Sequence, residues 1–458
     1  MTFYRRLRPL PLGPFDTIGP NDQFVEPHLG FAYAALTRIV RIDRGEVAAS
    51  LWSFACFFFV LCGYYVLRPL RDEMGVQGGV ENLPWLFSAT FAAMLAVAPV
   101  FGWAAARLPR RRLVPWTYLF FIANVLVFYA LFAVGVAPSA VARAFFVWVS
   151  VFNLFVVSLF WSLMVDLFRP EQAGRLFGFL SAGGSCGALA GPALTALLAA
   201  PFGTANLLLM SCGFLGLALV CIHALIRRGG AGASAGTAQT PAEVDDSIGG
   251  TTWSGIAEIP RSPYLLGIVA YVLLYTVLLG FAYFELARIV SAIYNDSAQR
   301  TVLFAQMDLA VNVLTLLGQL LVVAKLVEKL GVGAALALLP ALGLAGFVAI
   351  GLAPVLAVLI AFQILRRAAD YAIARPAREM LFTVLRREVK YKSKNFIDTV
   401  VFRSGDAASG WVYAALKGLG LGLAGLAAAA IPGAILWLFL GLWLGREHAR
   451  KSRGGVGT

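Results

Sequence analysis

The chain has 458 residues, of which 60% are hydrophobic and only 13% are charged, and its formal net charge at pH 7 is +13. A soluble domain carries about 25% charged residues, so this composition excludes an ordinary water-soluble fold. The apolar segments run for about twenty residues without alternation, which excludes a β-barrel and predicts membrane-spanning α-helices.

Twelve apolar segments are long enough to cross a bilayer, which requires about 20 residues each. The first six are predicted at 48–68, 84–106, 113–135, 140–166, 176–200 and 204–226. The second six are predicted at 263–287, 300–324, 332–352, 354–373, 396–416 and 418–444. The fold class is therefore an all-α polytopic membrane protein of about twelve spans, with both termini on the same side.

Basic residues are concentrated on one side of the predicted spans. Most of the 37 Lys and Arg residues fall in loops on the side of the termini, including 107–112 and 375–394, whereas the opposite loops 200–204 and 351–354 carry no charge. Because basic loops remain cytoplasmic, we predict cytoplasmic termini. The net charge then follows from topology and contact with anionic membrane lipids, with no nucleic-acid partner. Without a signal peptide or transit-like leader, we expect a bacterial inner membrane.

A polar segment divides the spans into two sets of six. Residues 227–261 are small, polar and rich in Pro, Gly and Ser, which is typical of a flexible linker. We therefore predict a cytoplasmic N-terminal segment at 1–47, six-helix bundles at 48–226 and 262–444, and a basic cytoplasmic tail at 445–458.

The two halves share a local sequence pattern. In the first half Asp166 precedes Arg175-Leu-Phe, and in the second half Asp370 precedes Arg375 and then Leu381-Phe. Because this pattern occupies an equivalent place in both halves, duplication of a six-helix unit explains it better than coincidence. Two pseudo-symmetric six-helix bundles joined by a cytoplasmic linker resemble the architecture of the major facilitator superfamily, with its substrate site between the halves near the midplane.

The first predicted span ends in a group of charged residues. Tyr64, Arg68, Arg71 and Asp72 are spaced by three or four residues and share one helix face, and Pro69 is expected to bend the helix beside them. A charge inside the bilayer costs at least about 2.5 kcal/mol on insertion scales, so charged residues at this position indicate a structural or functional role. One interpretation is an anion gate formed by the arginines. The alternative is that they extend to lipid headgroups or pair with Asp72.

Polar residues recur on the seventh and eighth predicted spans. Tyr275, Glu285 and Arg288 lie on the seventh. Glu285 and Arg288 are expected either to close an outer gate or hold substrate, or to form a simple interfacial ion pair. Asp308 lies deeper, on the eighth span, with Asn312 beyond it. It is expected either to carry a proton or coupling cation, or to make a structural hydrogen bond between helices.

Further charges lie toward the inner ends of the spans. They are Asp166 on the fourth span, Arg366, Arg367 and Asp370 on the tenth, and Asp398, Arg403 and Asp406 on the eleventh. We expect many of them to form salt bridges that latch an inner gate. Gly183, Gly187 and Gly191 on the fifth span form a stripe that is expected to serve close helix packing.

The sequence contains no pattern for a cofactor or metal. The five cysteines lie in apolar segments without metal-ligand spacing, and the three histidines lie far apart. The absence of a Walker-type lysine loop argues against an ATP-driven pump. We therefore predict no cofactor, no metal and no enzymatic activity.

Several motifs resemble those of a known transporter family. They are Leu67-Arg68-Pro69-Leu70-Arg71-Asp72, Phe284-Glu285-Leu-Ala-Arg288, Arg378-Glu379-Met380, Lys390-Tyr391-Lys392-Ser393-Lys394 and Ile397-Asp398. In these motifs the chain resembles the ATP/ADP antiporter-type nucleotide transporters of plastids and intracellular bacteria, a branch related to the major facilitator superfamily. The resemblance implies that Arg71 and Glu285 belong to the substrate-translocating set and that Asp166 stands near the acidic position of helix 4.

Two positions depart from that family's pattern. The family has a basic residue after a glycine on helix 11, whereas Gly405 is followed here by Asp406, which removes a phosphate-binding charge. Arg71 stands in place of lysine, which keeps the charge and changes its geometry.

Together these features predict a secondary active transporter that moves a small organic anion, such as a nucleotide or related metabolite, by alternating access. Arg68 and Arg71 would attract the anion, and Glu285 and Asp308 would couple its movement to protons or to a counter-transported anion. One alternative is a proton-coupled carrier or exporter of another solute or lipid. The other is a non-transporting membrane receptor or assembly factor.

Overall fold

The computed structural model describes residues 42–232 and 258–453. These residues form helices connected by short turns. The predicted N-terminal segment lies almost wholly outside the described residues, and so does most of the predicted linker. The all-helical architecture expected from the composition is confirmed.

The first half is a bundle of six long helices. They are α2 (Val47–Gln77), α3 (Leu83–Arg107), α4 (Arg110–Val134), α5 (Pro138–Leu167), α6 (Pro170–Phe202) and α7 (Asn206–Gly232). Each overlaps one predicted span. The prediction ended the first span at residue 68, but α2 continues through Pro69 to Gln77. Arg68, Arg71 and Asp72 therefore lie within a helix rather than at its outer end.

The second half contains more interruptions. Its helices are α9 (Pro263–Ile293), α10 (Ser297–Gly318), α11 (Ala324–Leu352), α12 (Leu356–Ala369), α13 (Arg375–Leu381), α14 (Arg387–Phe396), α15 (Phe402–Gly418) and α16 (Leu423–Arg453). Gly331, with a φ of 76°, breaks α11 just before the predicted start of the ninth span. Residues 353–355 separate α11 from α12, which confirms the predicted division of the apolar stretch 331–373.

Three wide π-helical turns interrupt this half, namely η3 (Gln319–Val323), η4 (Asp370–Ala374) and η5 (Ile397–Val401). η4 joins α12 to α13 and η5 joins α14 to α15, so the tenth and eleventh predicted spans are bulged helices. Ten other helices in the described part of the chain are long and apolar enough to cross a membrane. With the two bulged helices they match the twelve predicted spans. Such bulges often mark functional sites.

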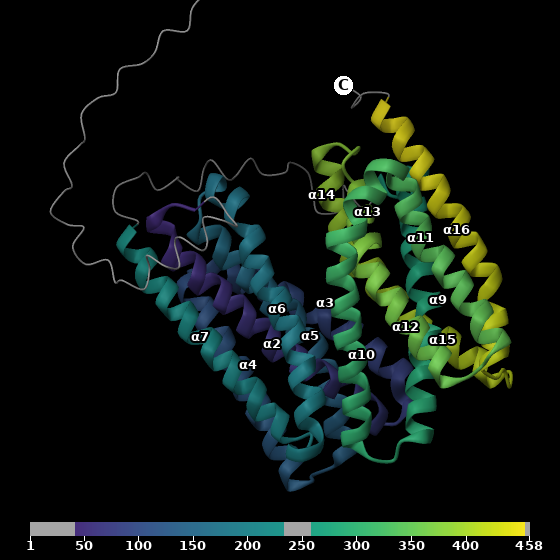
Figure 1. The fold of residues 1–458 in the computed structure, drawn as a ribbon, viewed down its shortest axis with the longest axis horizontal. Helices are drawn as coiled ribbons and strands as arrows, with labels where there is room; N and C mark the ends of the chain where they lie inside the picture. Colours follow the sequence, from purple (N-terminus) through teal and green to yellow (C-terminus); the bar gives the residue numbers. More distant parts are fainter. Residues whose placement is uncertain (1–41, 233–257, 454–458) are drawn as a thin grey trace, which may run out of the picture.

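The two bundles lie side by side and spread apart toward one end of the molecule (Figure 1). α2 begins and α16 ends at that end, which we call the terminal face; the opposite end is the far face. The bundles contact each other through α2, α3 and α6 of the first half and α9, α10 and α15 of the second. These six helices therefore form the contacts between the two halves.

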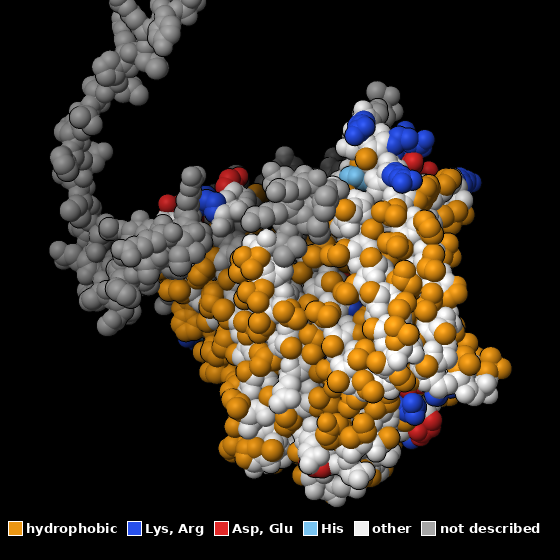
Figure 2. All heavy atoms as spheres, turned by 45° about the vertical axis from the view of Figure 1, so that its right-hand side comes forward, with side chains coloured by type: hydrophobic (Ala, Val, Ile, Leu, Met, Phe, Trp, Pro, Cys, Tyr) orange, Lys and Arg blue, Asp and Glu red, His pale blue; other side chains and the backbone are white. Residues whose placement is uncertain are grey.

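The outer surface of the bundles is apolar over its middle. Figure 2 shows hydrophobic side chains covering the flank of the helices, with most charged side chains near the two ends. Large side chains such as Trp116, Leu197 and Phe439 are more than half exposed. In water this surface would be unfavourable, so it is suited to contact lipid.

Glycines on α6 allow that helix to approach α2 closely. A Cβ added at Gly183 or Gly187 would clash with the backbone carbonyl oxygen of Phe54 or Phe58, and one at Gly191 would lie 2.8 Å from the carbonyl oxygen of Cys62. The stripe therefore serves helix packing, as the spacing predicted.

Gly187→Ala is expected to lower the free energy of unfolding by about 1–3 kcal/mol, because the methyl group meets backbone atoms of α2 that cannot move aside independently. The matched control is Gly178→Ala on the same helix, where an added Cβ meets nothing within 4 Å. Thermal unfolding of the purified protein in detergent measures both. Equal melting temperatures for the two variants would contradict the packing role.

Candidate functional site

A cavity of about 760 Å³ lies between the two bundles. Side chains from α2, α5 and α6 line it on one side, and side chains from α9, α10, α12 and α15 line it on the other. The lining follows α2 back to Phe57 and continues past the end of α10 to Gln319 in η3, so the cavity extends toward the terminal face. A space of this size suits a small organic solute.

Contacts between the bundles close the cavity at the far face. Glu73 on α2 pairs with Arg300 on α10, with Arg300 Nε and Nη2 donating to the two carboxylate oxygens at 2.6 and 2.7 Å. Trp411 Nε1 on α15 donates to Ser88 Oγ on α3 at 3.0 Å, and its ring meets Trp85 edge to face. The structure is therefore closed at the far face.

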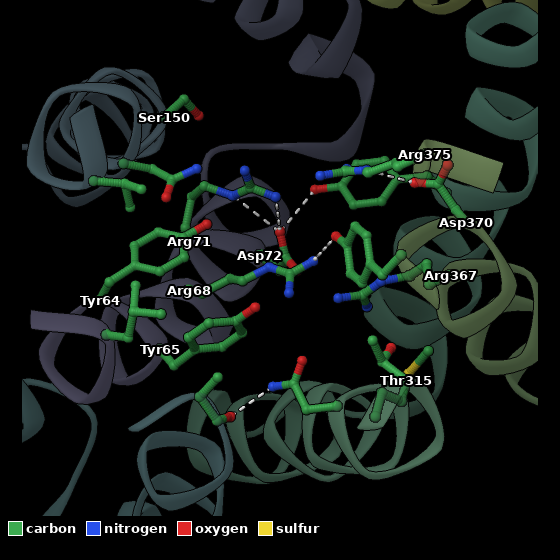
Figure 3. A pocket seen from close by; sticks show the side chains of 18 of the residues that line it. Tyr64, Tyr65, Arg68, Arg71, Asp72, Ser150, Thr315, Arg367, Asp370 and Arg375 are labelled. Atoms are coloured by element: carbon green, nitrogen blue, oxygen red, sulfur yellow. Dashed lines mark hydrogen bonds and ion pairs between the residues drawn. The ribbon is translucent and has the colours of Figure 1, made fainter. Parts of the chain in front are cut away.

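The first charged group in the cavity comes from α2. Arg71 donates to Asp72 Oδ1 from Nη2 at 2.6 Å and from Nε at 3.1 Å, and the Tyr283 hydroxyl of α9 donates to the same oxygen at 3.1 Å. Tyr64 lines the wall beside them. In Figure 3, Arg71 and Asp72 lie on the side of Tyr64 and Arg68, and Arg367 lies on the opposite side. The predicted pairing of Arg71 with Asp72 therefore exists, but it lines the cavity and joins the two bundles.

Asp308 on α10 sits between two arginines. Arg367 Nη2 of α12 donates to Asp308 Oδ1 at 2.5 Å, and Arg68 Nη1 of α2 lies 3.6 Å from the same oxygen. Arg68 Nη2 also donates to the Tyr371 hydroxyl of η4 at 3.2 Å. Asp308 is 1% exposed, so its charge is balanced by these guanidinium groups rather than by water. One carboxylate thus serves two cations from opposite bundles.

A third group surrounds the π-helical turn η4. Asp370 Oδ2 accepts from Arg375 Nε at 3.1 Å and from the Tyr275 hydroxyl at 3.0 Å. Arg366, one turn earlier, donates from Nε to the side-chain oxygen of the neutral Gln363. These side chains all line the cavity. The extra residue of the bulge places Asp370 and Tyr371 in its wall.

On α15, Arg403 pairs with Asp406 at 3.3 Å, and both line the cavity. Asp406, which stands where the ATP/ADP antiporter-type family has a basic residue, is thus held in an ion pair without net charge.

Asn312 lies one turn beyond Asp308 on α10. It donates to the Ala188 carbonyl oxygen at 2.6 Å and so links α10 to α6.

Three of the predicted site residues lie away from the cavity. Asp166 is exposed at the end of α5. Glu285 is buried inside the second bundle, where it pairs with Arg288 at 2.8 Å and with Lys417 at 3.2 Å. Glu285 and Arg288 therefore form an ion pair with Lys417 as an additional partner, and Glu285 itself is enclosed by the second bundle.

The remaining predicted residues gather at the cavity, with Asp308 immediately behind its wall. They are Tyr64, Arg68, Arg71, Asp72, Tyr275, Asp308, Arg403 and Asp406. Sequence reasoning missed Tyr65, Gln363 and Tyr371. The only signal for Tyr371 was its position next to Asp370 in an apolar helix, and a tyrosine there is also an ordinary membrane-helix residue.

The arrangement concentrates positive charge. Among the residues that the structure describes, six arginines line the cavity, namely Arg68, Arg71, Arg366, Arg367, Arg375 and Arg403. Four carboxylates stand against them, namely Asp72, Asp370 and Asp406 in the wall and Asp308 behind it. A buried space with excess guanidinium groups attracts anions, because its low dielectric strengthens each interaction.

Solved structures share this fold. A bacterial homolog of the human lysosomal transporter Spinster, in an inward-facing and unoccupied conformation, aligns with a TM-score of 0.55 and 14% identity over 90% of this chain and 98% of that one. The nucleoside transporter NupG aligns with a TM-score of 0.59 and 11% identity over 87% and 98%. The peptide transporter POT in complex with sulfate aligns with a TM-score of 0.57 and 17% identity over 89% and 99%.

A search of curated protein sequences finds no match. The family model described as Major Facilitator Superfamily matches residues 53–369, which is more than half of the chain. The two six-helix bundles, the cavity between them and the closed far face agree with that match. The chain belongs to the Major Facilitator Superfamily.

Proposed function

We propose that the chain is a secondary transporter that moves a small organic anion through the central cavity by alternating access. The observation that carries this proposal is the excess of arginine over carboxylate in the cavity. Neutral solutes would leave those charges uncompensated, and cations would be repelled. An anion lying between Arg68 of the first bundle and Arg367 of the second would contact both halves at once.

Orientation follows from the basic loops. With the terminal face in the cytoplasm, as the positive-inside rule predicts, the described structure is closed to the outside and its cavity extends toward the cytoplasm. We further propose that this membrane is a bacterial inner membrane. Transport requires the Glu73–Arg300 contact to break and the bundles to close at the terminal face.

The solute class includes nucleotides and related phosphorylated metabolites. The motif around Arg68 and Arg71 supports this class, and tyrosines of both bundles line the cavity, where rings can stack on a base. Asp406, which is held by Arg403, leaves no free cation at that point of α15. Such a cavity is compatible with exchange of one anion for another and with symport of an anion with protons.

Uptake into proteoliposomes tests the proposal. We expect the reconstituted protein to accumulate at least one anion from a panel of AMP, ADP, ATP, glycerol 3-phosphate and succinate, and to transport neither adenosine nor glycerol. Parallel assays with an internal anion and with an imposed pH gradient distinguish exchange from proton coupling. Uptake of neutral solutes alone would refute the anion proposal and leave a carrier of another solute.

A further inference from the structure

Arg366 differs from the other arginines of the cavity. Arg68, Arg71, Arg367, Arg375 and Arg403 each lie within 4 Å of a carboxylate oxygen. Arg366 has no carboxylate at that distance among the residues the structure describes, and its hydrogen-bond partner there is the neutral side chain of Gln363. It is only 9% exposed, yet it lines the cavity.

A buried guanidinium group without a carboxylate in direct contact is poorly compensated, because burial removes water and no hydrogen-bonded opposite charge replaces it. Its position on α12 gives it no route to lipid headgroups, since the residue is enclosed by the bundle and its accessible surface faces the cavity. Gln363 accepts the Nε hydrogen and so leaves the two terminal nitrogens available. This geometry suits a guanidinium group that pairs with an anionic group of the bound solute.

A second positive charge is left without its own carboxylate. Arg68 and Arg367 share the single oxygen Asp308 Oδ1. One carboxylate can neutralise only one of them. Within the described residues the cavity therefore holds two uncompensated charges, one on Arg366 and one on the pair that shares Asp308.

We propose that Arg366 is a solute-binding residue and that the transported solute is a dianion, such as a dicarboxylate or a phosphate monoester. One of its charges binds Arg366, and the other binds the Arg68–Arg367 pair. This inference rests on the proposed anion transport and extends it to the charge of the solute.

Two substitutions remove the free charge by different routes. Arg366→Gln removes the cation itself. Gln363→Glu places a carboxylate beside Arg366 and so occupies it with an internal anion. Gln363→Met is the matched control for the second, because it has similar volume and no charge. Arg450→Gln, on an exposed arginine near the end of α16, is the matched control for the first.

Ligand-dependent thermal stabilisation of the purified full-length protein in detergent gives apparent Kd values. The probes are succinate and butyrate, which differ by one carboxylate, AMP and adenosine, which differ by the phosphate, and glycerol 3-phosphate. We expect a dianion to bind the wild-type protein at least about tenfold more tightly than butyrate, since each hydrogen-bonded charge contributes at least that factor.

Arg366→Gln and Gln363→Glu are each expected to raise the dianion Kd about tenfold or more, whereas Gln363→Met has a clearly smaller effect and Arg450→Gln has none. In the absence of ligand, Gln363→Glu is expected to raise the melting temperature, because it supplies Arg366 with a partner. Opposite effects on stability and on affinity are not expected from a merely structural role.

Three results would overturn the inference. Equal affinity of the wild type for succinate and butyrate, with no preference for either phosphate ester, would exclude a dianion site. Unchanged dianion affinity in Arg366→Gln would exclude Arg366 as a binding residue while leaving anion transport intact. If none of the probes stabilises the wild type and none is taken up by proteoliposomes, the proposed function fails together with the inference.

Discussion

Asp308→Asn is expected to reduce anion uptake by about 100-fold or more and to lower the free energy of unfolding by about 3–5 kcal/mol. The carboxylate is 1% exposed, accepts from Arg367 at 2.5 Å and lies 3.6 Å from Arg68. A neutral amide would leave both guanidinium groups buried without a carboxylate, and removing one member of a buried pair carries that cost. Uptake by proteoliposomes and thermal unfolding in detergent measure the two effects.

A second substitution separates charge balance from solute binding. Asp308→Asn combined with Arg367→Gln returns the cavity to its original net charge. We therefore expect this double variant to recover much of the lost stability but not the uptake, because Arg367 would also bind the solute. Asp296→Asn at the start of α10 is the matched control, since asparagine caps a helix about as well as aspartate.

The single substitution Asp308→Asn also distinguishes the two roles considered for Asp308. If this residue carried a coupling proton, the amide would mimic the protonated carboxyl group, and exchange would continue without response to a pH gradient. We expect loss of exchange instead, because a neutral amide cannot balance the two guanidinium groups that share this oxygen. Preserved exchange in Asp308→Asn would contradict the charge-balancing role.

Arg300→Gln is expected to shift the equilibrium between the closed and open far face by about two to four orders of magnitude toward the open state. Glu73 has a fully buried side chain in the closed state, where two hydrogen bonds from Arg300 balance its charge. Without Arg300 the carboxylate is buried and unpaired, which costs about 3–5 kcal/mol. Opening the far face exposes Glu73 to water and removes that cost.

Distances between spin labels measure this shift. Val136 and Ala353 lie in far-face loops of the two different bundles, and both are exposed. After replacement of the native cysteines, labels at these positions are expected to move apart in Arg300→Gln and to return toward the wild-type distance when Glu73→Gln is added. Arg143→Gln is the control, because Arg143 donates to Gly78 within the first bundle. An unchanged distance distribution in Arg300→Gln would show that this contact does not hold the far face closed.

The sequence by itself predicted about twelve spans, their division into two halves and a break within the apolar stretch 331–373. These features depend on runs of apolar residues along the chain, because a lipid solvent requires each span to satisfy its own backbone hydrogen bonds over about 20 residues. The close packing of Gly187 was also predictable, since a spacing of four places small residues on one helix face. The bulges at η4 and η5 were not, because no local residue pattern requires them.

Only the tertiary structure decided which charges share a site. Glu285 and Asp308 are both acidic residues in apolar helices, but one is paired inside its own bundle and the other joins α10 to α2 and α12. Arg366 and Arg367 are adjacent in the chain, yet one residue of helix turns the side chain by about 100°, and only Arg367 reaches Asp308. Asp308, which balances the charge of Arg367, comes from a different helix. Within the described residues Arg366 has no such partner, and its charge is the one that the solute is proposed to balance.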